Sequence, residues 1–490
     1  MNVAWSSGWR RPWFSLLVLL SVTCLPATLR GATPVQQQLN SLTAAAQGRR
    51  IGLITNPSGC DEAGNLDADY LLYTNGLSIS AFFAPEHGLR GSLPPGQGGG
   101  DYVDPQTGIP VYAVYGTRNA PTDAQLTNVD LVVFDLQDVG VRFYTFVWTM
   151  TYCMEAAARN GKPFYVIDRP NPIGGLRIEG APNTVNYGLI GRLGPGASFG
   201  VATRHGLTAG EIAALWNGEW MSPKVELHVL TMPNWSRSQW WTETGRLFVP
   251  PSPNMRTPDA ATVYPGTCIF EGSNLSVGRG TDKPFEKIGA PFISGSAWAA
   301  CLNTNGLPGV RFDPITFTPT NYPGAPWLNQ NCGGVQVVAT NRDTFDPIRT
   351  GLVMLQTVCQ MYPSQASATS YAAQLMGVPG LDTSIKTADI NAIMAGWQAT
   401  LLQFRALRRR YLLYPETPPL INSIRLVPPA RNQVELAWTA LNGRSYRLYY
   451  RDRLSSPWNT MNDYTGTGGM ATVTDALGPT LQFYRLELLP

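Results

Sequence analysis

Short apolar segments that alternate with helical patterns constrain the fold of this chain more than any other feature. Residues 51–56, 77–85, 109–116, 129–140 and 163–175 each contain a continuous apolar run, as in IGLITN and VDLVVFDLQDVG. Helical patterns cover 35–50 and 148–161. Continuous apolar strands between helices are typical of a parallel sheet with both faces covered. The sequence therefore predicts an α/β fold, with a Rossmann-like parallel-sheet domain over residues 33–210.

A second α/β subdomain is predicted over residues 211–416. Thr208 and Glu211 have the spacing of a capping box at a helix start. Strand-like runs at 225–232 and 334–340 and helical patterns at 347–362 and 384–414 follow. Between them, the Pro- and Gly-rich residues 250–292 predict a long active-site loop.

The C-terminal residues 420–490 have a different pattern. PETPPL at 415–420 has the composition of a linker. Beyond it, QVELAWTAL, SYRLYYRD, ATVTDA and QFYRLELL alternate with period two. They predict an all-β sandwich of the fibronectin type III kind, with Trp438 and Trp458 in its core.

Residues 1–32 predict a signal peptide. Arg10 and Arg11 precede an apolar stretch too short to span a bilayer comfortably, and small residues follow it. We expect an exported protein, periplasmic or extracellular, with no membrane span after cleavage; a retained anchor is the alternative. The six cysteines after residue 32 are scattered, without a Cys-x-x-Cys pair. Disulfides and buried thiols both remain open.

Charge and motifs exclude several functions. The net charge is only +3, without a dense basic patch, so no nucleic-acid partner is expected. Glycine fingerprints for nucleotides are missing from the sequence, so no nucleotide and no cofactor is expected.

Polar residues end four of the predicted strands. These are Asn56, the Glu86-His87 pair, the Gln137-Asp138 pair and Asp168-Arg169. Ligands of open parallel sheets bind beyond the carboxyl ends of the strands. A site at this edge is therefore expected.

Glu86 and His87 are the leading candidates for catalysis. A carboxyl group in a cleft can act as a general acid, and a neighbouring histidine can orient it or contact substrate. A metal site is less favoured, because neighbours on an extended chain point to opposite faces and the chain has only three histidines. A polar structural loop is the other alternative.

Three further segments offer polar side chains. Asp138 could supply a second carboxylate and Arg142 could bind an anion, or Asp138 could cap the next helix. The loop after residue 167 presents Asp168 and Asn171, with a structural Asp168–Arg169 pair as the alternative. Residues 250–292 add a further set, namely Asn254, Glu271, Asn274 and Arg279. Carboxyls, arginines, amides and aromatics together suit sugar chemistry.

The motifs also resemble a known family. PEHGLRG, DLQDVGVRFYTF, DRPNPIGG, RHGLTAGEIA, PSPNM, YPGTCIFEGSNLS and GRGTDKPFEKIGAPF resemble, over residues 48–414, the domain of unknown function 1343, associated with NamZ-type exo-β-N-acetylmuramidases. The resemblance implies an enzyme that releases terminal N-acetylmuramic acid from the non-reducing ends of peptidoglycan fragments, so a peptidoglycan-derived glycan is the expected partner.

The resemblance also implies roles. Glu86 would be the general acid with His87 beside it, and Asp138 the base or the group that orients the substrate acetamido group. The implied substrate-binding residues are Asn56, Arg90, Gln137, Arg142, Tyr144, Asp168, Asn171, Arg204, His205, Asn254, Glu271, Asn274 and Arg279. Of these, Arg90, Arg142 and Arg279 would meet the lactyl group. One departure is Val277, which stands where the family pattern has glutamate.

Two other functions stay open at this point. A non-catalytic cell-wall glycan-binding protein would bind without turnover, with the C-terminal sandwich aiding attachment. A metal-dependent esterase or deacetylase would need more ligands than three separated histidines suggest.

Overall fold

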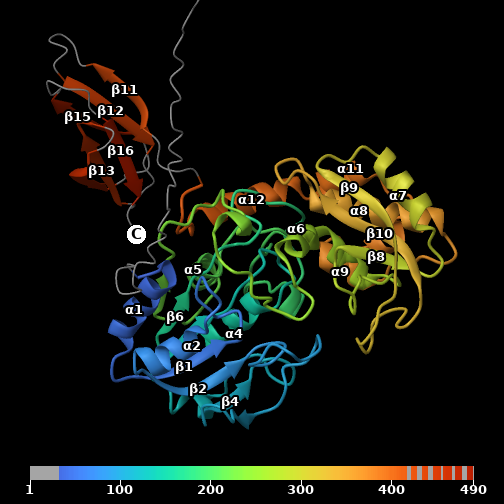
Figure 1. Ribbon diagram of the computed structural model, residues 1–490, viewed down its shortest axis with the longest axis horizontal. Helices are drawn as coiled ribbons and strands as arrows, with labels where there is room; N and C mark the ends of the chain where they lie inside the picture. Colours follow the sequence, from blue (N-terminus) through green and yellow to red (C-terminus); the bar gives the residue numbers. More distant parts are fainter. Residues whose placement is uncertain are drawn as a thin grey trace, which may run out of the picture.

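The computed structural model describes residues 32–416, 421–426, 433–439, 445–453, 456–465, 470–476 and 483–488 (Figure 1). The predicted signal peptide, apart from its last residue, and most of the predicted linker lie outside the described residues. Three groups of elements follow one another along the chain: a mostly parallel α/β domain, a smaller α/β domain, and two antiparallel sheets.

The first domain is built on a seven-stranded sheet with the order β3-β4-β2-β1-β5-β6-β7. Its strands are β1 Arg50–Thr55, β2 Ser78–Ala84, β3 Tyr102–Val103, β4 Pro110–Ala113, β5 Leu131–Asp135, β6 Phe164–Ile167 and β7 Leu227–Leu230. All pairs are parallel except β3 with β4. Its helices are α1 Pro34–Ala46, α2 Asp67–Asp69, the π-helical turn η2 Tyr70–Thr74, α3 Asp123–Leu126, α4 Phe146–Arg159, the 3₁₀ turns η3 Gly188–Ile190 and η4 Trp241–Glu243, and α5 Ala209–Glu219. The predicted Rossmann-like parallel sheet is confirmed.

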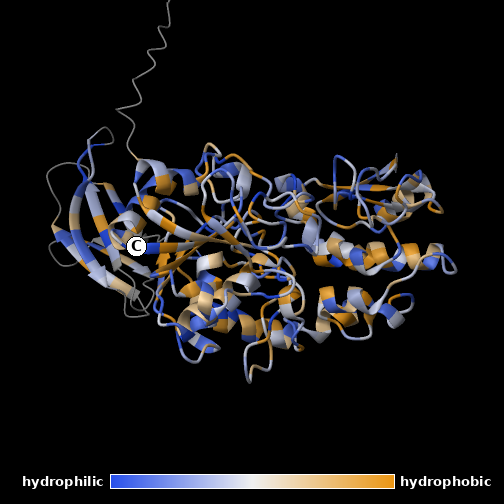
Figure 2. Cartoon of the chain, turned by 90° about the horizontal axis from the view of Figure 1, so that it is seen from below, coloured by the Kyte–Doolittle hydropathy of each residue, from blue (hydrophilic) through white to orange (hydrophobic). Residues whose placement is uncertain are grey.

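Both faces of this sheet are buried, which explains its continuous apolar strands. Leu53 and Val133 pack in the cluster that contains α1. Their neighbours Ile54 and Phe134 pack in the cluster that contains α4 and α5. Figure 2 shows hydrophobic residues along the central strands and on the helices beside them. Each fully buried aliphatic or aromatic side chain contributes about 1.5–3 kcal/mol.

The first domain extends beyond residue 210, the boundary predicted from the sequence. Helix α5 begins after the Thr208–Glu211 capping box, as predicted. It packs in the core of the first sheet, and β7 then pairs in parallel with β6. The run at 225–232 therefore belongs to the first sheet, because its register completes that sheet's edge.

The second domain contains a three-stranded antiparallel sheet, β8-β10-β9, with helices around it. Its strands are β8 Lys287–Ala290, β9 Val310–Phe317 and β10 Cys332–Ala339. Its helices are α6 Pro258–Thr267, the 3₁₀ turn η5 Cys268–Gly272, α7 Gly295–Thr304, α8 Pro347–Met361, α9 Ser370–Met376, α10 Leu381–Ser384, α11 Ile390–Gly396 and α12 Gln398–Arg409. Helix α8 matches the predicted pattern at 347–362, whereas the pattern at 384–414 is divided between α11 and α12.

The predicted long loop at 250–292 is a correction, since it contains α6, η5 and β8. Helix α6 carries Pro265 and Gly266 in its last turn, which weakens the helical signal. Tertiary packing requires this glycine: a Cβ on Gly266 would lie 1.8 Å from the Pro347 carbonyl oxygen. Close contact with α8 therefore determines the helix where local propensity does not.

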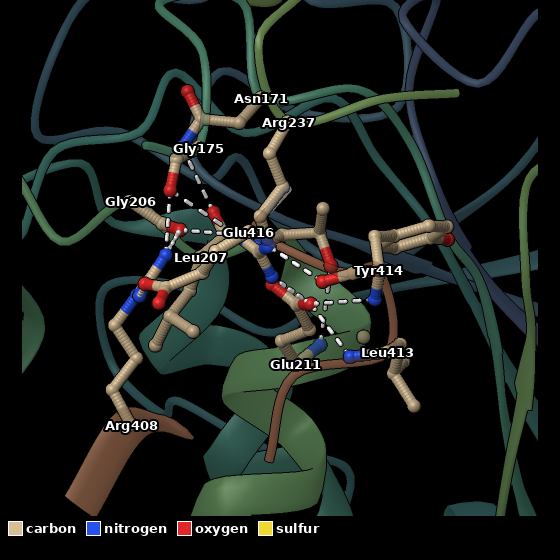
Figure 3. A network of polar contacts seen from close by, with 12 residues as sticks. Asn171, Gly175, Gly206, Leu207, Glu211, Arg237, Arg408, Leu413, Tyr414 and Glu416 are labelled. Atoms are coloured by element: carbon tan, nitrogen blue, oxygen red, sulfur yellow. Dashed lines mark hydrogen bonds and ion pairs between the residues drawn. The ribbon is translucent and has the colours of Figure 1, made fainter. Parts of the chain in front are cut away.

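The two α/β domains share one hydrophobic core, and a polar network ties the end of the second to the first. Arg237 donates to the carbonyls of Gly206 and Tyr414, both at 2.7 Å, and to the Glu211 carboxylate (Figure 3). Arg408 donates to the same Gly206 carbonyl at 2.9 Å. These buried bonds fix the chain after α12 against α5.

The C-terminal residues form two three-stranded antiparallel sheets, β11-β12-β15 and β14-β13-β16. The strands are β11 Ile421–Leu426, β12 Gln433–Thr439, β13 Ser445–Arg451, β14 Asn459–Thr465, β15 Met470–Ala476 and β16 Phe483–Leu488. Trp438 is fully buried in their shared core, as predicted. Trp458 is a correction, because it is half-buried beside arginines and is not among the residues of that core.

The structure also describes the state of the cysteines and the length of the apolar helices. Within the described residues, Cys60, Cys153, Cys268, Cys301, Cys332 and Cys359 are all free thiols. None of the helices in this part of the chain is both long and apolar enough to cross a bilayer.

Candidate active site

A cavity of about 580 Å³ lies where the two α/β domains meet. The first domain contributes the segment after β2 and the turn before α4, and the second contributes η5, the chain before β8 and α9. The lining residues are Glu86, His87, Pro94, Pro95, Gly96, Gln97, Tyr115, Phe143, Tyr144, Thr145, Ile190, Ser252, Asn254, Met255, Tyr264, Phe270, Glu271, Leu275, Val277, Arg279, Phe285, Tyr322, Pro323, Gly324, Pro326 and Tyr371. The cavity therefore opens at the carboxyl edge of the parallel sheet, as expected.

Glu86 is held at the cavity wall by donors from two different loops. Strand β2 ends at Ala84, and Pro85 turns the chain so that Glu86 faces the cavity. Its Oε1 accepts from the Gly96 N–H at 2.7 Å, and its Oε2 accepts from the Thr145 hydroxyl at 2.7 Å. The Tyr115 hydroxyl also hydrogen-bonds to this carboxyl group. The carboxyl group is therefore fixed in orientation before any ligand binds.

His87 adopts a left-handed backbone conformation, with φ of 71°. Such a conformation costs about 1–2 kcal/mol in a residue with a Cβ and is found preferentially at functional sites. Its N–H donates to the Gln97 carbonyl at 2.8 Å, which holds the turn. The ring Nδ1 lies 2.7 Å from the Leu93 carbonyl oxygen, so it carries the proton. Burial lowers the pKa of His87, which leaves a neutral ring with Nε2 as an acceptor.

Glu271 and Arg279 form an ion pair on the opposite, second-domain side of the cavity. Burial raises the pKa of Glu271, Arg279 opposes this, and the charge of Glu86 adds to it. Glu86 and Glu271 therefore lie within electrostatic reach of each other. Arg279 also lies near the Tyr322 hydroxyl, which accepts from the Asn254 side chain at 3.0 Å. Among the described residues that line the cavity, Arg279 is the one arginine or lysine.

Aromatic and aliphatic side chains form a further part of the cavity wall. The ring of Tyr264 lies edge-on to Phe143 at 5.2 Å and to Phe285 at 4.6 Å. Val277, which departs from the family pattern, is 3% exposed in this wall. A polar pair on each side of an apolar surface suits a ligand with both hydroxyl and methyl groups.

The cavity brings together six of the residues predicted from the sequence: Glu86, His87, Tyr144, Asn254, Glu271 and Arg279. It also contains residues that sequence reasoning missed, of which Thr145 and Tyr115 contact Glu86 directly. Thr145 follows Tyr144 within a motif already singled out, and Tyr115 ends a predicted strand. Both residues lie close to the end of a predicted strand, and this position was the signal that could have identified them as site residues.

Asp138 does not line the cavity, so its role as a second catalytic carboxylate stays a prediction from the sequence. It is 5% exposed, and its Oδ2 accepts from the Gly140 N–H at 2.7 Å. The same oxygen lies 3.5 Å from Nε2 of the buried His205. These two partners hold one oxygen of the Asp138 carboxyl group behind the cavity wall.

Two of the three arginines expected at an anionic group also lie elsewhere. Arg142 is fully buried and donates to the carbonyls of Ile190 at 2.8 Å and Leu375 at 2.5 Å. Arg90 pairs with Asp104 at 2.5 Å, in a separate small pocket that Asn56 also lines. Arg142 therefore joins backbone segments rather than a ligand.

The other predicted contacts stabilise loops behind the cavity. Asp168 accepts from the hydroxyls of Thr208 and Tyr414 at 2.7 and 2.8 Å, and burial followed by the charge of Glu211 raises its pKa to about 6. The remaining bonds are Asn56 to Pro251 O, Gln137 to Pro170 O, Asn171 to Leu207 O, Arg204 to Glu179 and Asn274 to Gln365 O. The donors in these remaining bonds reach backbone carbonyls or the half-buried Glu179 carboxylate, and they do not line the cavity.

Arg169 joins Asp67 and Asp135, which replaces the alternative of an Asp168–Arg169 pair. Among the residues described, no three His, Cys, Asp or Glu side chains gather as a metal ion would require.

The fold and the site define a two-domain α/β protein with a carboxyl-bearing cavity at the carboxyl edge of its parallel sheet. Residues 51–259 match the family described as exo-beta-N-acetylmuramidase NamZ, N-terminal, and residues 262–414 match the corresponding C-terminal domain. The chain belongs to the NamZ exo-β-N-acetylmuramidase family.

Individual relatives agree with this. A peptidoglycan beta-N-acetylmuramidase NamZ from Bacillus subtilis (strain 168) is 43% identical over 371 residues, 75% of this chain and 87% of the relative. Two crystal structures of DUF1343 family proteins from Bacteroides fragilis cover 78% of this chain and 99% of their own. Their identities are 32% and 26%, with TM-scores of 0.69 and 0.62. The family domains end at residue 414, so the C-terminal sheets lie outside them.

Proposed function

We propose that the protein hydrolyses the β-glycosidic bond of a terminal N-acetylmuramic acid at the non-reducing end of peptidoglycan fragments. The observation that most supports this proposal is a single cavity with Glu86 on one side and the Glu271–Arg279 pair on the other. Membership of the NamZ family and the activity named for its Bacillus subtilis relative support this choice.

Glu86 is the proposed general acid. In the reaction, its proton goes to the glycosidic oxygen and the C1–O bond breaks. A water molecule then gives its hydroxyl to C1, and its remaining proton restores the protonated acid. Its support is the contact of each carboxyl oxygen with a donor at 2.7 Å, which holds the group in one orientation. When Glu86 is protonated, the Thr145 hydroxyl can rotate and accept a hydrogen bond from the Glu86 carboxyl group.

Arg279 is the proposed partner of the lactyl carboxylate. Arginine binds carboxylates with a planar pair of donors, and the Arg279 side chain is only 22% exposed, which strengthens such a contact. Glu271 and the Phe285 ring, 5.6 Å from the guanidinium, hold Arg279 in place. The neutral His87 ring offers Nε2 to a substrate hydroxyl on the other side.

The protein is proposed to act outside the cytoplasm. Residues 1–32 support this with an arginine pair, an apolar core and small residues before the first described helix. A peptidoglycan substrate is consistent with export.

Incubation with glycan fragments that end in N-acetylmuramic acid, followed by mass spectrometry, tests the proposal. The wild-type protein should release the free sugar, and Glu86→Gln should abolish release while its melting temperature stays within a few degrees. Wild-type protein that binds the fragments without releasing sugar would identify a glycan-binding protein instead. Release by Glu86→Gln at the wild-type rate would remove Glu86 from the proposed role.

A further inference from the structure

The aromatic residues that line the active-site cavity fall into two groups by exposure. Five of them are buried, namely Phe143, Tyr144, Tyr264, Phe270 and Phe285. Three tyrosines are more exposed, and each comes from a different part of the chain: Tyr115 follows β4, Tyr322 lies between β9 and β10, and Tyr371 is the second residue of α9. We call Tyr115, Tyr322 and Tyr371 the tyrosine triplet. Its rings are the aromatic surfaces of the cavity that a ligand can reach most readily.

The three hydroxyl groups of the triplet differ in their partners. Tyr115 hydrogen-bonds to the Glu86 carboxyl group, and Tyr322 accepts from the Asn254 side chain at 3.0 Å. Tyr371 is 36% exposed, more than the other two, and its hydroxyl has no hydrogen-bond partner among the described residues. The protein itself therefore leaves one ring and one hydroxyl at the cavity unused.

The backbone around Tyr371 is held in place by close packing of α9 on η5. The Thr369 N–H donates to the Gly272 carbonyl at 2.7 Å. A Cβ on Gly272 would lie 2.0 Å from the Ala372 nitrogen, so a side chain at this position would displace α9. Turn η5 also carries Glu271, so Tyr371 is anchored beside the second carboxyl group of the cavity. An anchored side chain loses less entropy when a ligand binds.

Tyr371 and Tyr115 approach the cavity from different domains. Tyr371 lies within electrostatic reach of Glu271 and Arg279 on its own domain, and of Tyr115 on the other. Because Tyr115 bonds to Glu86, both tyrosines lie near the group proposed to protonate the glycosidic oxygen. They are therefore placed to contact a sugar joined through that oxygen.

The glycosidic oxygen has one sugar on each side. The muramic acid has its proposed contact in Arg279, whereas the leaving sugar needs contacts of its own. Since the muramic acid is the terminal unit, the rest of the glycan lies beyond the leaving sugar and extends to solvent. The most exposed aromatic residue of the cavity suits that side. Aromatic rings pack against the apolar faces of sugars, and a tyrosine hydroxyl can donate to or accept from a sugar hydroxyl.

We propose that Tyr371, together with Tyr115, binds the leaving sugar, the first N-acetylhexosamine beyond the scissile bond. This inference rests on the proposed function, which defines the sugar that leaves. Tyr371 is then a determinant of specificity. It favours substrates in which muramic acid is joined to another sugar over glycosides with a small leaving group. Arg279 selects the sugar that is released, and Tyr371 selects the sugar from which it is released.

Isothermal titration of the full chain tests the proposal. All proteins carry Glu86→Gln, which prevents turnover. One ligand is the disaccharide of N-acetylmuramic acid β-linked to N-acetylglucosamine, and the other is the methyl β-glycoside of N-acetylmuramic acid, which lacks a leaving sugar. Tyr371→Ala should raise the Kd for the disaccharide about tenfold and leave that for the methyl glycoside within about twofold.

Two further variants serve as controls. Tyr371→Phe keeps the ring and removes the hydroxyl, so it should raise the disaccharide Kd only about threefold. Because it preserves the packing of the ring, it also keeps the test decisive if truncation to alanine disturbs α9. Tyr73→Ala removes an exposed tyrosine of η2 that does not line the cavity, and it should bind both ligands as the parent does.

Two results would overturn the proposal: unchanged disaccharide affinity in Tyr371→Ala and Tyr371→Phe, or an equal loss for both ligands, which would place Tyr371 at the muramic acid. Hydrolysis is judged separately, with Glu86 intact, by release of free N-acetylmuramic acid from the disaccharide. Wild-type protein might release none while the Glu86→Gln protein still binds the disaccharide through Tyr371. That result would refute the proposed hydrolysis and uphold the site for the second sugar.

Discussion

The Thr145 hydroxyl donates to Glu86 Oε2 across 2.7 Å and so connects the turn before α4 with the end of β2. Glu86 follows β2 and Thr145 lies in the connection from β5 to α4, and β1 separates these two strands in the sheet. The proposed acid therefore depends on a residue nearly sixty positions away for its orientation.

Thr145→Val should lower kcat by up to about tenfold, because it keeps the shape of the side chain but removes the hydrogen bond that orients the Glu86 carboxyl group, worth about 0.5–1.5 kcal/mol. Thr145→Ser keeps the hydroxyl and should retain at least half of the activity. Steady-state kinetics on a chromogenic muramic acid glycoside measure both. Equal rates for Val and wild type would show that Glu86 is oriented without Thr145.

Arg279 should determine the preference for a lactyl-bearing sugar. Arg279→Ala should lower kcat/KM for the muramic acid glycoside 10- to 100-fold, the range expected for a hydrogen bond to a charged group. The corresponding N-acetylglucosamine glycoside, which lacks the lactyl group, should change less than threefold and serves as the internal control. An equal loss for both sugars would assign Arg279 a structural role only, through its pair with Glu271.

The features predictable from the sequence are those set by local pattern. Continuous apolar runs predicted the buried parallel strands, and the polar pair after β2 predicted that Glu86 and His87 lie at a site, where the cavity is found. The direction of a side chain after a strand depends on the following turn. Asp138 and Arg142 follow β5 as closely as Glu86 follows β2, yet their turn directs them into the protein. No pattern of residue types distinguishes these two cases.

Tertiary packing explains the other misses. The last turn of helix α6 contains Pro265 and Gly266, a pair that predicts a loop from local propensity. Helix α8 packs so closely on Gly266 that only a residue without a Cβ fits there. Glu271 lies in η5, which begins where α6 ends. Because α6 was not predicted, the position of this second carboxyl group at the cavity could not be predicted either. Trp458 is a large aromatic residue of the kind that usually fills a core, but its ring stacks on Arg451.

A buried cluster of two carboxyls and one arginine predicts a pH effect on stability. Asp67 and Asp135 both contact Arg169, and burial, followed by the charge of Asp135, raises the pKa of Asp67 to about 8. The folded protein therefore keeps a proton that the unfolded chain releases near pH 4. The free energy of unfolding should fall as pH rises from about 4 to 8, by at most ~1.4 kcal/mol per pH unit from this group.

Asp67→Asn mimics the protonated acid and should flatten this slope, so that the variant gains stability relative to wild type as pH approaches 8. Thermal and urea unfolding at several pH values measure the difference. Asp69→Asn, two residues further along at an exposed position, should leave the slope unchanged. An unchanged slope in Asp67→Asn would show that Asp67 is ionised in the folded protein over this pH range.

Arg142 offers the sharpest contrast with Arg279, because the same residue type has a different task in each place. Its guanidinium is fully buried and donates to the carbonyls of Ile190 and Leu375, which belong to different domains, and burial lowers its pKa to about 10. Arg142→Met should remove these bonds, leave both carbonyls without this donor, and lower the free energy of unfolding by about 3–5 kcal/mol. In urea unfolding, the midpoint should shift accordingly. The folded fraction should keep the wild-type ratio of kcat/KM for muramic acid over N-acetylglucosamine glycosides, whereas Arg279→Ala lowers that ratio. A fall in this ratio for Arg142→Met, with stability unchanged, would place Arg142 at the substrate after all.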